Sequence, residues 1–131
     1  MLKAVETVTI INRTTEKGLD TYHCRILHGV SWYAQNKYTP DTGGLKASKV
    51  YKIRIPDSLL TGYLDPDQYA GAADKIALWT LAPGDKILLG EKESVTGAEF
   101  AALARTSTAC TVLDVHKNLY GMNPHFYVEG G

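Results

Sequence analysis

Apolar and polar residues alternate over several short stretches of this chain, a pattern typical of β-strands with one covered face. Alternation is clearest in residues 48–56, where Tyr51, Ile53 and Ile55 occupy one set of positions and Lys52 and Arg54 the other. We expect the apolar set to face a core and the basic set to face solvent. Residues 5–13 are rich in β-branched side chains, which favours a second strand. A loop over 14–20 should join this strand to a returning strand at 22–27.

The stretch 76–90 predicts the centre of the fold. Two apolar runs, 76–79 and 86–89, flank the sequence Ala82-Pro83-Gly84-Asp85. Proline presets φ near −65° and glycine tolerates positive φ, so Pro83-Gly84 is typical of a tight turn. We therefore expect a central hairpin with Trp79 as its largest core residue.

One helix is predicted, near residues 97–106. Thr96 and Glu99 are spaced as a capping box, in which each side chain binds the other residue's backbone N–H. Phe100 and Leu103 then fall on one helical face.

The remaining pattern completes a mostly β (α+β) chain. Gly29 should break the chain before a third strand at 30–38, and the cluster 39–44 has turn composition. Further strands are expected at 111–116 and 126–128, whereas 57–74 has no clear period and is typical of an interaction loop. These elements predict a small β-barrel or sandwich of about seven strands in a single domain, residues 1–131.

Composition narrows the classes of function. Lys and Arg together equal Asp and Glu, 14 each, so no basic excess is present to neutralise a phosphate backbone, which argues against a nucleic-acid partner. No apolar run approaches the ~18 residues of a membrane span, and the first residues lack the apolar region of a secretion signal. A soluble cytoplasmic protein is expected, with Cys24 and Cys110 as reduced thiols.

The spacing of ionisable residues predicts no catalytic site, metal site or cofactor. The four histidines match no zinc pattern, and no Gly-rich phosphate loop or nucleophile motif is present. An acidic series in the irregular segment leaves open a small metal-dependent enzyme; it consists of Asp57, Asp65, Asp67 and Asp74. A solvated loop accounts for the same series, so we expect a non-enzymatic protein.

Aromatic side chains are the more informative candidates for function. Packing in the core or at a protein interface accounts for them, because aromatic residues are enriched in both places. We predict an interface role for five: Trp32, Tyr33, Tyr38, Tyr63 and Tyr69. The alternative is an OB-like barrel that stacks single-stranded nucleic acid on Trp32, Tyr33 and Tyr51.

Several short motifs occur in a recognisable order. They are an early strand with Trp32, Ile55-Pro56 at the end of a strand, Tyr63 and Tyr69 in a loop, and Trp-Thr-Leu-x-x-Gly-Asp from Trp79 to Asp85. From about Trp32 onward the chain resembles small uncharacterised structural proteins from the head–tail morphogenesis region of phages and prophages of Gram-positive bacteria. The resemblance implies a non-enzymatic minor capsid, head–tail connector, head-closure or tail-completion protein, found in the virion and, during assembly, in the host cytoplasm. It also implies portal, connector or tail proteins as partners, and a homo-oligomer on assembly.

Overall fold

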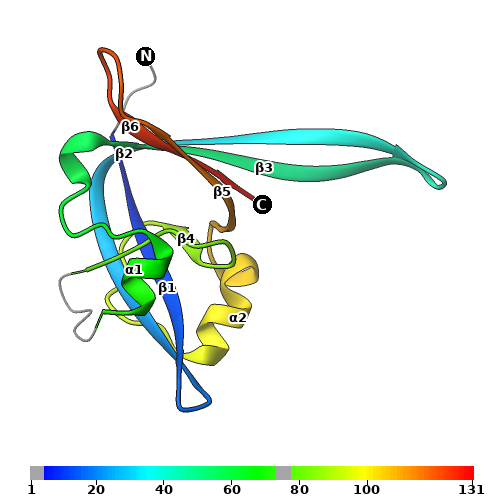
Figure 1. Cartoon of the computed structure of the whole chain (residues 1–131). Coiled ribbons are helices and arrows are strands. Elements are labelled where there is room, and N and C mark those ends of the chain that lie inside the picture. The colour runs from blue at the N-terminus through cyan, green and yellow to red at the C-terminus, as the bar shows by residue number, and fades with distance from the viewer. Residues whose placement is uncertain (1–4, 73–77) are drawn as a thin grey trace.

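Six antiparallel strands close into a barrel in the order β1-β2-β3-β6-β5-β4 (Figure 1). The computed structural model describes residues 5–72 and 78–131. The strands are β1 (Glu6–Glu16), β2 (Leu19–Asp41), β3 (Gly44–Pro56), β4 (Lys86–Leu89), β5 (Ala109–Asn118) and β6 (His125–Gly130). A 3₁₀ turn η1 (Asp57–Leu59) and the helices α1 (Pro66–Ala70) and α2 (Gly97–Thr106) complete the described elements. The prediction of a small, mostly β fold is confirmed, and the strands form a closed barrel.

The β1–β2 connection is tighter than predicted. Strand pairing continues to Glu16 and Leu19, so the loop consists of Lys17 and Gly18 alone. Both have positive φ, 53° and 79°, which matches the right-handed twist of two paired strands. The expected loop over 14–20 is therefore wrong, because a two-residue turn lets Thr14 and Thr15 remain in the ladder.

Gly29 bends β2 instead of ending it. The register with β1 shifts at this point, from Thr7 opposite His28 to Glu6 opposite Val30, and Gly29 takes a φ of 94°. Such a bulge bends a strand locally. β2 pairs with β1 up to Val30 and with β3 from Ser31 onward, so the two strands predicted at 22–27 and 30–38 are one continuous strand.

The barrel core is built around Trp79, which is fully buried. The Trp79 indole N–H donates to the Thr61 carbonyl at 3.0 Å, so its one polar atom is satisfied. As predicted, Ile53 and Ile55 face this core and are also fully buried, while Tyr51 is half-buried against it. The main cluster comprises Val8, Ile10, Leu27, Val30, Ile53, Ile55, Trp79, Leu81, Ile87, Cys110, Val112, Phe126 and Val128.

Within residues 78–89, the part of the predicted central hairpin that the structure describes, no hairpin forms. β4 pairs with β1 and β5, and Trp79 makes only an isolated bridge with Tyr63. The first residues of the predicted hairpin, Ile76 and Ala77, lie outside the described residues. The predicted turn is confirmed: the Asp85 amide donates to the Ala82 carbonyl at 3.0 Å, and Gly84 has a φ of 96°.

Helix α2 covers a second, smaller core beside the barrel. Its predicted capping box is confirmed, since the Glu99 amide donates to the Thr96 hydroxyl and the Thr96 amide to the Glu99 carboxylate. Phe100 and Leu103 are buried together with Ile11, Leu88, Val95 and Ala109. No described helix is long and apolar enough to cross a membrane.

Candidate functional site

A two-stranded arm leaves the barrel and extends to its right in Figure 1. It consists of residues 34–41 of β2, residues 44–50 of β3 and the two-residue turn between them. β1 pairs with β2 only up to Val30, and β6 pairs with β3 only from Tyr51. Neither outer edge of the arm therefore pairs with another described strand. Eight β2 residues at about 3.4 Å each give the arm a reach of roughly 27 Å.

The β2–β3 pairing continues without a shift from the barrel into the arm, so it shows which arm residues share a face with the barrel core. Trp32 pairs with the core residue Ile53, so the pairs that alternate with it share the core-side face. On the arm these pairs include Pro40 with Leu45 and Asn36 with Lys49, and Tyr38 also lies on this face. On the opposite face the arm carries Gln35, Ser48 and Val50, and Tyr33, Lys52 and Arg54 continue that face onto the base of the arm. Tyr38, Pro40 and Leu45 thus make the outer end of the core-side face apolar, whereas Asn36 and Lys49 make the same face polar nearer the barrel.

Of the five predicted interface aromatics, Tyr33 and Tyr38 lie on the surface. They are 46% and 63% exposed, and they point to opposite faces of the β2–β3 ribbon because they are five residues apart. Trp32 is half-buried at the base of the arm, with its ring centroid 5.3 Å from that of Tyr51. The residues proposed as a stacking platform are therefore divided: Trp32 and Tyr51 pack on each other, while Tyr33 faces away.

The other two predicted interface residues belong to the folded interior. Tyr63 is half-buried, and its ring makes edge contacts with Trp79 at 5.1 Å and Phe126 at 4.8 Å. Tyr69, on α1, is only 2% exposed. The five aromatic residues therefore do not form one surface, and Tyr33 and Tyr38 are the two available to a partner.

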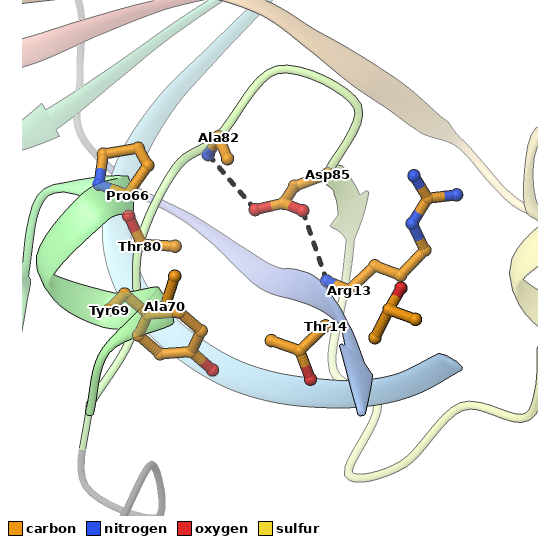
Figure 2. Close-up of a pocket in the computed structure, with 9 residues that line it drawn as sticks. Arg13, Thr14, Pro66, Tyr69, Ala70, Thr80, Ala82 and Asp85 are labelled. Atoms are coloured by element: carbon orange, nitrogen blue, oxygen red, sulfur yellow. Dashed lines mark hydrogen bonds between the residues drawn. The ribbon is translucent and has the colours of Figure 1, made fainter. Parts of the chain in front are cut away.

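A pocket of about 280 Å³ lies between β1, α1 and the turn before β4, with the Asp85 carboxylate at one side (Figure 2). Asp85 is 4% exposed and accepts three hydrogen bonds, from Asn12 Nδ2 at 2.9 Å, the Ala82 amide at 3.1 Å and the Arg13 amide at 3.2 Å. Figure 2 shows the Arg13 guanidinium turned away from this carboxylate. The remaining lining residues are Thr14, Thr15, Pro66, Tyr69, Ala70 and Thr80.

The chemistry of Asp85 is that of a structural carboxylate. Burial raises its pKa above the ordinary value of 3.8, although the hydrogen bonds from Asn12, Ala82 and Arg13 lower it in part. Both oxygens are directed at donors of the protein itself. Asn12 extends the network, donating to the Thr80 carbonyl at 2.6 Å and accepting from the Thr80 amide at 3.1 Å. Together, Asn12 and Asp85 hold the 80–85 segment against β1.

The acidic series proposed for a metal does not converge in the part of the chain that the structure describes. Asp57 begins η1 and Asp67 lies on α1, while Asp65 pairs with Lys117; Asp74 lies outside the described residues. Among residues 5–72 and 78–131, no three His, Cys, Asp or Glu side chains are placed to hold a metal ion.

The two thiols are separate and poorly ionised. Burial raises the pKa of Cys110 to about 12, and burial, partly offset by Lys92, raises that of Cys24. Both are free cysteines.

One exposed apolar element was not anticipated from the sequence. The loop between β5 and β6 contains Leu119, Tyr120 and Met122, which are 40%, 96% and 97% exposed. Its short run of residues gives no periodic signal, so only the unusual combination of Tyr and Met beside Gly121 could have identified it.

Comparison with known proteins places the chain in one family without a described activity. No curated protein and no solved structure matches it. A family described as a family of unknown function (DUF6751) matches residues 3–131, almost the whole chain. The protein therefore belongs to the DUF6751 family.

Proposed function

We propose that this protein is a non-enzymatic structural component of a phage or prophage particle, acting in head–tail joining or completion through protein–protein contacts made by the arm. The observation that carries the proposal is the arm itself. It extends roughly 27 Å from the barrel, and its core-side face exposes Tyr38 and Leu45 at 63% and 75%.

The energetics of an isolated ribbon support a docking role. A two-stranded hairpin is marginally stable in water, because it buries little apolar surface and leaves both edges unpaired. A partner can cover the apolar face and pair with either edge. The motifs that resemble phage head–tail proteins, from Trp32 to Asp85, point to the class of partner: portal, connector or tail proteins.

The register of the arm allows a clean test. Gln35 and Val50 are directly paired, so residues 36–49 can be replaced by Asn-Gly, which closes a two-residue hairpin turn. The shortened protein should keep the barrel and its thermal unfolding midpoint within a few degrees of wild type. Tagged wild-type protein should retain co-expressed portal, connector or tail proteins encoded beside it, and the shortened protein should not. Equal retention by both proteins would contradict the role given to the arm.

A second candidate function is nucleic-acid binding, favoured by charge at the arm and its base. Residues 31–56 carry five Lys or Arg and one Asp, a net charge of 5 − 1 = +4 in a chain that is neutral overall. A two-stranded ribbon also has the width of a major groove. Fluorescence anisotropy with single-stranded and duplex oligonucleotides at 50 mM and 200 mM salt tests this function. Binding that weakens steeply with salt and disappears in the shortened protein would establish it.

A further inference from the structure

Two exposed apolar surfaces lie on different sides of this protein. One is the core-side face of the arm, with Tyr38, Pro40 and Leu45. The other is the β5–β6 loop, where Tyr120 and Met122 are almost fully exposed. Figure 1 shows the arm running to the right of the barrel and the β5–β6 loop at its upper left, so a copy's own arm does not reach its own loop.

Charge distinguishes the two surfaces. Lys49 is exposed and lies on the core-side face of the arm, the face that also carries Leu45. Asp57 is exposed. It lies beside the loop, since its backbone amide donates to the Pro124 carbonyl at 3.0 Å. Lys117 also flanks the loop but is paired with Asp65, so an arm docked there brings Lys49 toward Asp57, whereas two arms packed face to face bring lysines together. Opposite charges favour the first arrangement and like charges oppose the second.

We propose that the apolar face of the arm of one copy docks on the β5–β6 loop of a second copy, head to tail. The inference rests on the proposed assembly function and names a second copy of this chain as a partner. Because the two contacting surfaces are different, the contact is heterologous, and its repetition produces a ring if the rotation between copies closes. Tyr38 and Leu45 on the arm, and Tyr120 and Met122 on the loop, are the apolar anchors of the contact.

Pairwise cross-linking distinguishes this contact from the alternatives. Leu45→Cys and Met122→Cys are made in separate proteins, each in a Cys24→Ser background; the buried Cys110, with its raised pKa, is a poor thiolate source. Under mild oxidation an equimolar mixture should give a disulfide-linked dimer at least about tenfold faster than either protein alone. Leu19→Cys mixed with Met122→Cys is the matched control, because Leu19 is 72% exposed at the β1–β2 turn, outside both surfaces.

Each result has a defined meaning. Fast linkage in the Leu45→Cys and Met122→Cys mixture, with slow linkage in the Leu19 control, supports the head-to-tail contact. Fast linkage of Leu45→Cys alone shows arms meeting arms and overturns it. Slow linkage in every mixture also overturns it, and retention of co-encoded particle proteins by the wild-type protein then decides separately whether the proposed function survives.

A charge exchange tests the same contact without a covalent bond. Lys49→Glu and Asp57→Lys should each weaken self-association about tenfold in sedimentation velocity, because each places like charges in the contact. Mixing the two proteins should restore association to within about threefold of wild type, since each arm then finds a surface of opposite charge. Lys17→Glu, at the exposed β1–β2 turn, should change nothing. Failure of the mixture to recover, after weakening by each single change, would contradict the pairing of these two surfaces.

Discussion

Asp85→Ala should destabilise the fold although Asp85 lies in no proposed interface. The substitution removes the acceptor of three hydrogen bonds and so leaves Asn12 Nδ2 and the amides of Ala82 and Arg13 without their partner. Trp79 and Leu81 enter the core from the segment that precedes β4. The hydrogen bonds to Asp85 hold this segment against strand β1. Loss of the carboxylate therefore acts on the barrel, not on the arm.

The size of the stability loss depends on whether each of the three donors finds another acceptor. A hydrogen bond to a charged group contributes about 1.5–3 kcal/mol, and a buried donor left unpaired costs about 1–3 kcal/mol. Two of the donors are backbone amides beside a pocket of about 280 Å³, which water can enter, and Asn12 keeps its bond to the Thr80 carbonyl. Removing a buried charge also recovers desolvation energy. We expect a net loss of about 2–4 kcal/mol in the free energy of unfolding, or roughly 8–16 °C in the unfolding midpoint.

Urea denaturation followed by circular dichroism measures this loss, with Asp114→Ala as an exposed control. The conservative Asp85→Asn variant tests whether the Asp85 side chain makes stability fall or rise with increasing pH. The folded-state pKa of Asp85 is raised above 3.8, so its protonated form is favoured by folding. The stability gained from protonated Asp85 is fully present below pH 3.8 and is lost as the pH rises through the folded-state pKa. Wild type should therefore lose stability relative to Asp85→Asn as the pH rises from 3.8. A loss below 1 kcal/mol for Asp85→Ala, or a relative gain of wild type with rising pH, would refute the reasoning.

Three further predictions concern packing, capping and thiol chemistry. A Cβ at Gly130 would lie 2.5 Å from Cys110 Sγ, so Gly130→Ala should cost about 1–3 kcal/mol by urea denaturation; the cost should fall in a Cys110→Ala background, and an unchanged cost would show that the clash is not with sulfur. Thr96→Ala removes the acceptor for the Glu99 amide and should cost about 1 kcal/mol; no loss of α2 stability in hydrogen exchange would contradict the capping role. With iodoacetamide at pH 8, Cys24 should react slowly and Cys110 only on unfolding, because burial raises the pKa of both thiols; prompt alkylation of Cys110 in the native protein would contradict its burial.

Local signals in the sequence were sufficient where neighbouring residues determine the structure. The Thr96–Glu99 capping box and the Pro83-Gly84 turn depend on contacts within three residues, and both form as predicted. The alternation that ends at Pro56 correctly placed Ile53 and Ile55 in the core, because a one-residue slip would expose both.

The errors arose where pairing is long-range. β4 lies between β1 and β5. The partners of Ile87 are Ile10 and Cys110, which are 77 and 23 residues away in the chain. An apolar run cannot specify such partners, and a hairpin with the preceding run was the nearest local solution. A glycine that ends a strand and one that bends it have the same sequence signal, so the pattern around Gly29 does not distinguish a break from a bend.

The arm could not be separated from the barrel by its sequence. Residues 34–50 have ordinary strand and turn composition, and whether β1 and β6 extend alongside them depends on where those strands stop pairing, at Val30 and Tyr51. The sequence also does not show which tyrosines of the candidate site are exposed. Tyr63 and Tyr69 are indistinguishable in sequence from Tyr33 and Tyr38, yet the first pair packs inside and the second lies on the surface. Tyr63 is covered because its ring packs against Trp79 and Phe126. Tyr69 is covered by the elements around α1.

Hydrogen exchange of residues 34–50 tests the central claim most directly. In the free protein the outer-edge amides of the arm have no described strand partner and should exchange far faster than those of β1 in the barrel. When the protein is bound to the portal, connector or tail proteins encoded beside it, the arm amides should slow at least about tenfold, while the barrel amides change little. Protection that appears elsewhere on the barrel while the arm keeps its free-state exchange would contradict the account.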